Sequence, residues 1–252
     1  MAFNELKYSI KCLYDDFFAD MHIDSKTGIV EGTNKRFSGY PYIGSNYVKA
    51  PVKILFIPLD TGKDECYEQN TFHSLESRES LFSPEIKFDE IQAHMAGLYA
   101  TSLFILKESL GLSDAWNQLW SKREYKSAKA IKLSADYLPR DLMTYVAYEN
   151  RFRFVTIKRG VEIKERGGDE DRRWLNPSRE SQMLWDEIQV FAPDVIVFQG
   201  TTGLWNCRIP ELKKTYTVVE AYHPSYYGGG ADKLQYIVDE IGAQLRNQGI
   251  SI

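Results

Sequence analysis

Apolar residues along this chain gather in short unbroken runs, and stretches with helical periodicity separate these runs. Val52–Ile57 is one such run and ends at Pro58, and Asp194–Gly200 contains another that ends at a glycine. Unbroken apolar runs of this length are typical of strands that are buried on both faces of a parallel sheet. Thr215–Ala221 and Phe152–Ile157 have the composition of further strands. The pattern therefore predicts roughly four strands.

Helical patterns fill the intervals between these strands. We expect a helix near Leu6–Phe18, a long helical region from about Pro84 to Leu112, and weaker helical patterning over residues 114–150. Asn176-Pro177 predicts a helix start, because Asn is a favoured N-cap and Pro suits the first helical turn. A last helix is expected from about Ala231 to Asn247.

The alternation of strands and helices predicts an α/β fold, namely a three-layer α/β/α sandwich around a mostly parallel, roughly four-stranded sheet. We expect the 252 residues to form a single domain. It would carry an N-terminal helical extension over about residues 1–50 and a basic, Gly-rich insertion at about 159–175. Ligands of such sheets bind beyond the carboxyl ends of the strands. This rule selects Pro58–Gly62 and His223–Ser225 as candidate site segments.

Composition is that of a folded protein, with 43% hydrophobic and 26% charged residues. No apolar run approaches the roughly 20 residues that a transmembrane helix needs, so membrane association is not expected. The first residues lack the basic flank and long apolar stretch of a signal peptide, which predicts a cytoplasmic protein.

The cysteines and histidines predict no metal centre and no cofactor. The three cysteines, Cys12, Cys66 and Cys207, are far apart in sequence and are interpreted as reduced thiols. An all-cysteine iron–sulfur cluster takes four ligands, so such a cluster is not expected. The four histidines show no metal-ligand spacing.

Charge taken alone does not favour a nucleic-acid binder. The net charge is -4, whereas phosphate contacts need a basic surface. Lysines and arginines do concentrate in residues 122–132 and 151–173. Either cluster by itself is more typical of a solvated face.

Two segments carry a resemblance to a known family. Pro58-Leu59-Asp60-Thr61-Gly62-Lys63-Asp64-Glu65 resembles the first motif of the uracil-DNA glycosylases, especially that of the iron–sulfur branch, which reads Gly-Glu-Ala-Pro-Gly-Arg-Asp-Glu. Ala221-Tyr222-His223-Pro224-Ser225-Tyr226-Tyr227 is similar to the second motif, Thr-Tyr-His-Pro-x-Tyr. Each motif is weak alone, but together on a strand–loop frame they are fairly specific.

Further matches occur in family order over roughly residues 50–245. Phe72 falls where the iron–sulfur branch has its base-stacking Phe, and Asn150 with the following strand resembles the second strand of the family. Asn176–Gly200 is similar to the family's Pro…Glu helix, which is followed by a Pro-x-Val-Ile strand and Gly.

The resemblance implies a monofunctional glycosylase that hydrolyses the N-glycosidic bond of a base turned out of DNA. Asp60 would stabilise the sugar cation or orient water, and His223 would stabilise the departing base anion. Phe72 would stack on the base, and Asn150 would bind its Watson–Crick edge. The classical uracil enzymes also carry Asp at position 60. The iron–sulfur branch has Ala there and uses the preceding Glu, which is Leu59 here.

Gly62 has a second implication, because the classical enzymes carry a Tyr there that excludes bases with a group at C5. The resemblance therefore implies a pocket that admits uracil or a C5-substituted pyrimidine, including the hypermodified cytosines of phage DNA. Repair and antiphage defence both stay open as roles. DNA contacts are expected from six residues, namely Lys63, Ser225, Tyr226, Tyr227, Arg151 and Arg153. Tyr227 stands in place of the family's Leu/Arg wedge, and the missing Arg leaves single- or double-stranded DNA open.

Other interpretations stay open at this point. Asp60 also suits a loop residue that caps a turn, His223 a strand-end residue bonded to backbone, and Phe72 an ordinary core position. The chain could be a non-catalytic DNA or nucleotide sensor on the same fold. A small-molecule hydrolase of flavodoxin-like topology is a more distant alternative, and no Gly-x-Ser-x-Gly sequence supports an esterase.

Overall fold

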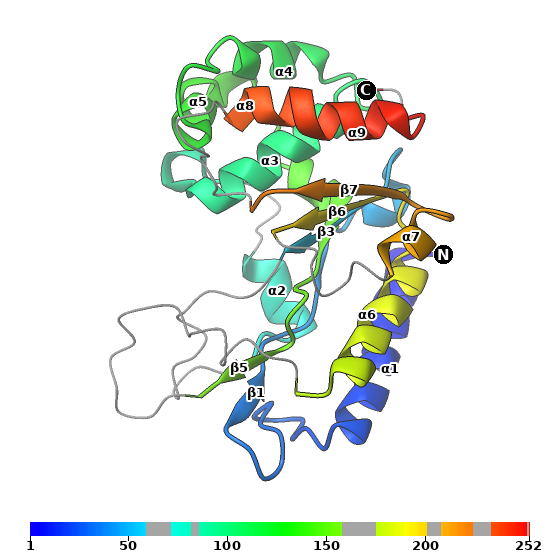
Figure 1. Cartoon of the computed structure of the whole chain (residues 1–252). Helices are drawn as coiled ribbons and strands as arrows, with labels where there is room; N and C mark the ends of the chain where they lie inside the picture. Colours follow the sequence, from blue (N-terminus) through cyan, green and yellow to red (C-terminus); the bar gives the residue numbers. More distant parts are fainter. Residues whose placement is uncertain (59–71, 82–85, 158–174, 201–207, 224–232, 251) are drawn as a thin grey trace. The chain divides into compact units, whose positions relative to one another are not determined.

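The structure is a computed structural model of the chain (Figure 1). It describes residues 1–58, 72–81, 86–157, 175–200, 208–223, 233–250 and 252. Its contacts divide the chain into two compact units, each discontinuous in sequence. The first unit comprises residues 1–43, 59–81 and 148–192, and the second comprises residues 44–58, 82–147 and 193–252.

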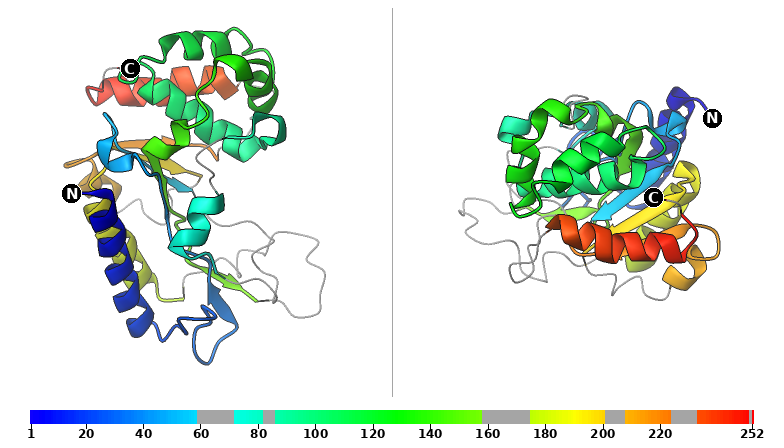
Figure 2. Two further views of the ribbon diagram at one scale, coloured as in Figure 1. Left: turned by 180° about the vertical axis from the view of Figure 1, so that it is seen from behind. Right: turned by 90° about the horizontal axis from the view of Figure 1, so that it is seen from above.

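Two long helices form one side of the first unit. α1 (Phe3–Asp20) and α6 (Pro177–Phe191) pack against each other and lie side by side in opposite views (Figures 1 and 2). The helix predicted near Leu6–Phe18 is confirmed, because α1 buries apolar and aromatic side chains at a spacing of three to four residues. The predicted N-cap of α6 is also confirmed, since the Asn176 side chain accepts a hydrogen bond from the Arg179 backbone N–H at 3.1 Å.

The same unit contains a small antiparallel sheet and a short helix. β1 (Lys35–Phe37) pairs with β5 (Phe154–Thr156), with Lys35 opposite Thr156 and Phe37 opposite Phe154. α2 spans Leu75–Leu81. The prediction of a strand over Phe152–Ile157 is confirmed, but we expected it in the central sheet. It pairs with β1 instead, a strand within the first 50 residues that the sequence pattern did not reveal.

Three parallel strands form the centre of the second unit. β3 (Ile54–Pro58), β6 (Val195–Gln199) and β7 (Thr217–Ala221) lie in that order, and both neighbouring pairs are parallel. Every residue of β3 and β6 is buried. The predicted parallel sheet of apolar runs is confirmed for these strands.

The full sheet has five strands, in the order β2-β4-β3-β6-β7. The two further strands, β2 (Tyr42–Ile43) and β4 (Val146–Tyr148), are two and three residues long. The sequence predicts roughly four strands and weak helical patterning over residues 114–150, so these two strands were not expected. Strands this short have no measurable periodicity, which is why they were missed. The chain is therefore an α/β protein, and its described residues form one five-stranded sheet and one two-stranded sheet.

Helices fill the rest of the second unit. Its α-helices are α3 (Ala93–Leu106), α4 (Ser113–Trp120), α5 (Ser127–Leu133), α7 (Ile209–Leu212), α8 (Lys233–Tyr236) and α9 (Gly242–Asn247). A π-helical stretch, Ile237–Ile241, joins α8 to α9. Among the described residues, 3-10 helices cover Tyr47–Lys49, Phe88–Glu90, Ala135–Tyr137 and Leu142–Tyr145.

The long helical region predicted over Pro84–Leu112 is shorter in the structure. α3 begins at Ala93 and is buried on nearly all sides from Ala96 to Leu106, as expected for a helix that is apolar all round. The C-terminal helix packs against β7 through its π-helical and α9 parts. In the described part of the chain, no helix is long and apolar enough to cross a membrane.

Candidate functional site

The strands from which the two candidate motifs continue, β3 and β7, both end at the carboxyl edge of the parallel sheet. Across the three parallel strands, Pro58 is in register with Gln199, and Gln199 is in register with Ala221. Adjacent strands lie about 4.8 Å apart, so the ends of β3 and β7 are roughly 10 Å apart. Both strands point the same way, so the chain leaves both at one edge of the sheet, where ligands bind in open α/β sheets.

Gly200 shapes the middle of this edge. Its φ of 105° lies in a region that favours glycine, and its backbone N–H donates to the Ala221 carbonyl at 2.9 Å. The bond extends the β6–β7 pairing by one residue and ends β6 beside the second motif. A cavity of about 420 Å³ opens there, lined by Gly200 and Ala221 together with Tyr222, Tyr236 and two glutamates.

Tyr222 is hydrogen-bonded to the C-terminal helix and packs against it. Its backbone N–H donates to the Tyr236 hydroxyl at 2.9 Å, and the two ring centroids are 5.4 Å apart. The Tyr222 side chain nevertheless remains 57% exposed. Tyr236 directly precedes the π-helical stretch, and such stretches occur frequently at functional sites.

A second histidine lies beside His223. The His94 and His223 ring centroids are 5.2 Å apart and the planes are tilted by 46°. Both side chains are partly exposed. His94 is the second residue of α3, whereas His223 follows β7. Sequence reasoning missed His94, because nothing in its local sequence relates it to a residue so distant along the chain.

Two buried amide side chains have unsatisfied oxygens. Gln199 ends β6 and is 4% exposed, and Asn150 in the first unit is also 4% exposed. Among the described residues, neither the Gln199 Oε1 nor the Asn150 Oδ1 has a hydrogen-bond partner. A buried unpaired polar atom costs about 1–3 kcal/mol, so both oxygens are candidates for contact with a ligand or water.

Arg153 belongs to a buried polar network, not to a surface. Its guanidinium donates to Glu149 at 2.5 Å and forms an ion pair with Glu187, and Tyr14 bonds to the same groups. Burial alone would lower the pKa of Arg153, but the two carboxylates raise it above its ordinary value. Its side chain is 0% exposed and cannot reach a phosphate, so the expected DNA contact by Arg153 is corrected.

The two glutamates share one guanidinium. Burial raises the pKa of Glu149 to about 8, although Arg153 opposes the shift and Glu187 adds to it. Burial also raises the pKa of Glu187, against the attraction of Arg153. One cation between two buried carboxylates favours a proton on one of them near neutral pH.

Arg151 is buried as well. Its side chain is 2% exposed, and its guanidinium carbon lies 5.8 Å from the centroid of the Phe152 ring. Burial lowers the pKa of Arg151 to about 10. The DNA contact expected from Arg151 is therefore also corrected, because a guanidinium that is withdrawn from solvent does not contribute to a basic surface.

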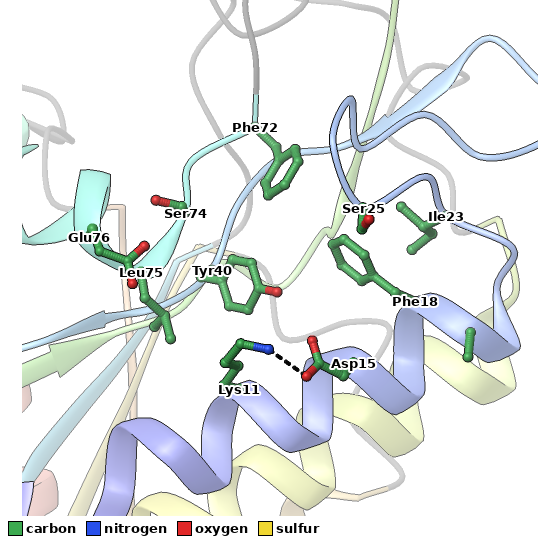
Figure 3. A pocket seen from close by; sticks show the side chains of 11 residues that line it. Lys11, Asp15, Phe18, Ile23, Ser25, Tyr40, Phe72, Ser74, Leu75 and Glu76 are labelled. Atoms are coloured by element: carbon green, nitrogen blue, oxygen red, sulfur yellow. Dashed lines mark hydrogen bonds and ion pairs between the residues drawn. The ribbon is translucent and has the colours of Figure 1, made fainter. Parts of the chain in front are cut away.

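Phe72 lines a cavity of about 470 Å³ in the first unit (Figure 3). We call this cavity the Phe72 pocket. Phe72 is partly exposed and contacts the rings of Phe18, Phe37 and Tyr40 at centroid distances of 5.7–6.3 Å. Phe72 thus contacts both an aromatic core and an open pocket, which suits a stacking residue.

Several expected site residues lie outside the described residues. They are Asp60, Gly62, Lys63, Ser225, Tyr226 and Tyr227, together with nearly all of the insertion at about 159–175. Their roles remain predictions. Of the other expected residues, Phe72, Asn150, Arg151 and Arg153 belong to the first unit and His223 to the second. Within the described ranges, no group of three or more His, Cys, Asp or Glu side chains could hold a metal ion.

No protein-family model matches this chain, and no curated protein sequence matches it.

Proposed function

We propose that this chain is a monofunctional DNA glycosylase of the uracil-DNA glycosylase superfamily, built as a three-layer α/β/α sandwich. It hydrolyses the N-glycosidic bond of a flipped-out uracil or C5-substituted pyrimidine and leaves an abasic site. The observation that carries the proposal is the register of Pro58 and Ala221 across β6. Both candidate motifs continue from strands that end at one edge of the parallel sheet with β6 between them, and the glycosylase resemblance requires such a placement.

The proposed reaction uses residues from both motifs. The bond between the sugar C1′ and the base nitrogen breaks, and the base leaves with the electron pair. Asp60 faces the cationic sugar and orients the water whose oxygen then bonds to C1′. His223 donates a hydrogen bond to the oxygen on which the base anion carries its charge. The water proton is released, and the base anion is protonated.

Two further side chains fit this scheme. We assign to His94, whose ring lies beside that of His223, the role of positioning the His223 imidazole. The unsatisfied Asn150 Oδ1 is an acceptor suited to an N–H on the Watson–Crick edge of a pyrimidine. DNA contacts are assigned to Lys63, Ser225, Tyr226 and Tyr227, and no longer to the buried arginines.

Base release from defined oligonucleotides tests the proposal. DNA that contains uracil, 5-hydroxymethylcytosine or glucosylated cytosine is incubated with the protein, and alkali then cleaves the abasic sites. We expect scission of at least one substrate, and a loss of about 100-fold or more in Asp60→Asn and in His223→Gln. Asp136→Asn, which removes an exposed carboxylate from a 3-10 helix, is the matched control and keeps full activity.

The outcomes separate the alternatives. DNA binding without scission of any substrate would contradict the enzyme and support a sensor. No DNA binding at low salt would contradict both. Scission that persists undiminished in Asp60→Asn and His223→Gln would show that the two motifs do not form the active site.

A further inference from the structure

We propose that the Phe72 pocket binds a planar base that carries an exocyclic amino group, as cytosine does and uracil does not. The inference rests on the proposed function, because it takes Phe72 as the residue that stacks on the target base. It adds a specificity that the resemblance does not supply. The residues that carry it are Asp15, Tyr40 and Glu76, in addition to Phe18 and Phe72.

Three rings form the apolar part of the pocket. The centroids of Phe18, Tyr40 and Phe72 are 5.9–6.3 Å apart in each pairing. Tyr40 is tilted by 37° to Phe18 and by 38° to Phe72, whereas Phe18 and Phe72 are tilted by 69° to each other. The three rings thus form a continuous aromatic part of the lining, which suits a flat aromatic ligand.

Carboxylates from two helices provide the polar part. Asp15 of α1 and Glu76 of α2 line the pocket, and the hydroxyl end of Tyr40 points toward Asp15 (Figure 3). Hydrogen bonds from its own backbone N–H and from the Ser74 hydroxyl lower the pKa of Glu76, so this group is ionised at neutral pH. Asp15 accepts a hydrogen bond from Lys11 at 2.6 Å.

The charge of these groups determines which base edge fits. An ionised carboxylate can only accept hydrogen bonds, so it can bind the two N–H groups of the cytosine amino group, whereas at the same position uracil has a carbonyl and offers only its neighbouring ring N–H as a donor. Lys11 supplies one cation against the two carboxylates, and its ammonium can donate to a base carbonyl. The pocket therefore favours a ring with both an amino group and a carbonyl group.

The back of the pocket is held in place by the buried network. The ring of Tyr40 packs on that of Tyr14, with centroids 4.4 Å apart, and Tyr14 is bonded within the network around Arg153. The Tyr40 carbonyl accepts a hydrogen bond from the buried Arg78 at 2.9 Å. Gly28 lies against Phe72 so closely that a Cβ there would be 2.6 Å from the ring. These contacts hold Tyr40 and Phe72 in place, and firmly held binding groups favour selective binding.

Equilibrium dialysis of the full chain against labelled deoxycytidine, deoxyuridine and choline tests the inference. We expect deoxycytidine to bind about tenfold more tightly than deoxyuridine, since a good base-edge contact supports that degree of discrimination. In the double variant Asp15→Asn/Glu76→Gln the amides can donate as well as accept, so the preference falls to about onefold. Asp16→Asn, an exposed neighbour on α1 that does not line the pocket, keeps the tenfold preference.

Four results would overturn the inference: equal binding of the two nucleosides, a preference that survives in the double variant, tighter binding of choline, or no saturable binding. Its failure is distinguishable from failure of the proposed function. A deoxycytidine preference without base release from any DNA would leave the pocket specificity standing and contradict the glycosylase. Base release from DNA without any nucleoside preference would support the glycosylase and contradict the pocket specificity.

Discussion

A hydrogen-bonded cluster of polar side chains lies within the core of the first unit, whereas the central strands of the second unit bury apolar residues almost throughout. Arg153, Glu149, Glu187 and Tyr14 form the buried network of the first unit. In the second unit, Gln199 is the buried polar residue of β3, β6 and β7.

The difference shows how each unit responds to change. An apolar strand core tolerates conservative substitution and is insensitive to pH, because it contains no titrating group. A buried ion network depends on every partner, since removal of one leaves an unpaired charge out of water. The first unit also contains the Phe72 pocket, and Tyr40 in the lining of this pocket packs on Tyr14 of the network. We therefore expect the pocket, and not the sheet, to depend on electrostatics.

The largest expected effect comes from removing the network's cation. Arg153→Met should lower the free energy of unfolding by about 3–5 kcal/mol, because Glu149 and Glu187 lose their shared partner while buried. Urea unfolding at pH 7 measures the loss. Arg179→Met is the matched control, since Arg179 pairs with Asp20 at the surface and should cost below about 1 kcal/mol.

Neutralising the two carboxylates tests whether this loss of stability arises from their buried charges. Adding Glu149→Gln and Glu187→Gln to Arg153→Met removes the buried charges, so part of the lost free energy should return. A triple variant that is no more stable than Arg153→Met would show that the network acts by packing alone.

The next effect is a dependence of stability on pH. The pKa of Glu149 is about 8 in the folded chain, above its ordinary value of 4.5. The folded state therefore holds its proton more tightly, and the resulting stabilisation is complete below about pH 4.5 and lost as the pH rises through about 8. We expect the free energy of unfolding to fall across this range by up to about 1.4 kcal/mol per pH unit relative to Glu149→Gln.

Urea unfolding of the wild type and of Glu149→Gln at pH 5.5, 6.5, 7.5 and 8.5 measures this dependence. Glu79→Gln, which removes an exposed partner of Lys7, is the control and should follow the wild type. Parallel curves for wild type and Glu149→Gln would mean that Glu149 is ionised in the folded chain throughout.

The smallest effect is expected in the second unit. Ile196 lies fully buried in β6, and Ile196→Val removes one methylene group. We expect a loss of about 0.5–1.5 kcal/mol. The loss should be the same at pH 5.5 and at pH 8.5. A loss that changes with pH would break the distinction between the two units.

Much of the fold could be predicted from the sequence, because its signals are local. The apolar runs of β3 and β6, the helix face of α1 and the N-cap Asn176 each depend on neighbouring residues. β2 and β4 were missed because strands of two or three residues have no periodicity. The partner of β5 was missed for a related reason, since pairing with β1 is decided by contacts between distant segments.

The candidate site divides in the same way. The sequence by itself pointed to two segments that resemble glycosylase motifs, and it predicted that both follow parallel strands, as the ends of β3 and β7 confirm. Only the tertiary structure decided that Pro58 and Ala221 share one register across β6, and that His94 lies beside His223. It also decided that Arg153 is an interior residue. An arginine in the sequence can lie on a surface or in the interior. Only the folded chain, which places Glu149 and Glu187 around Arg153, decides between these two environments.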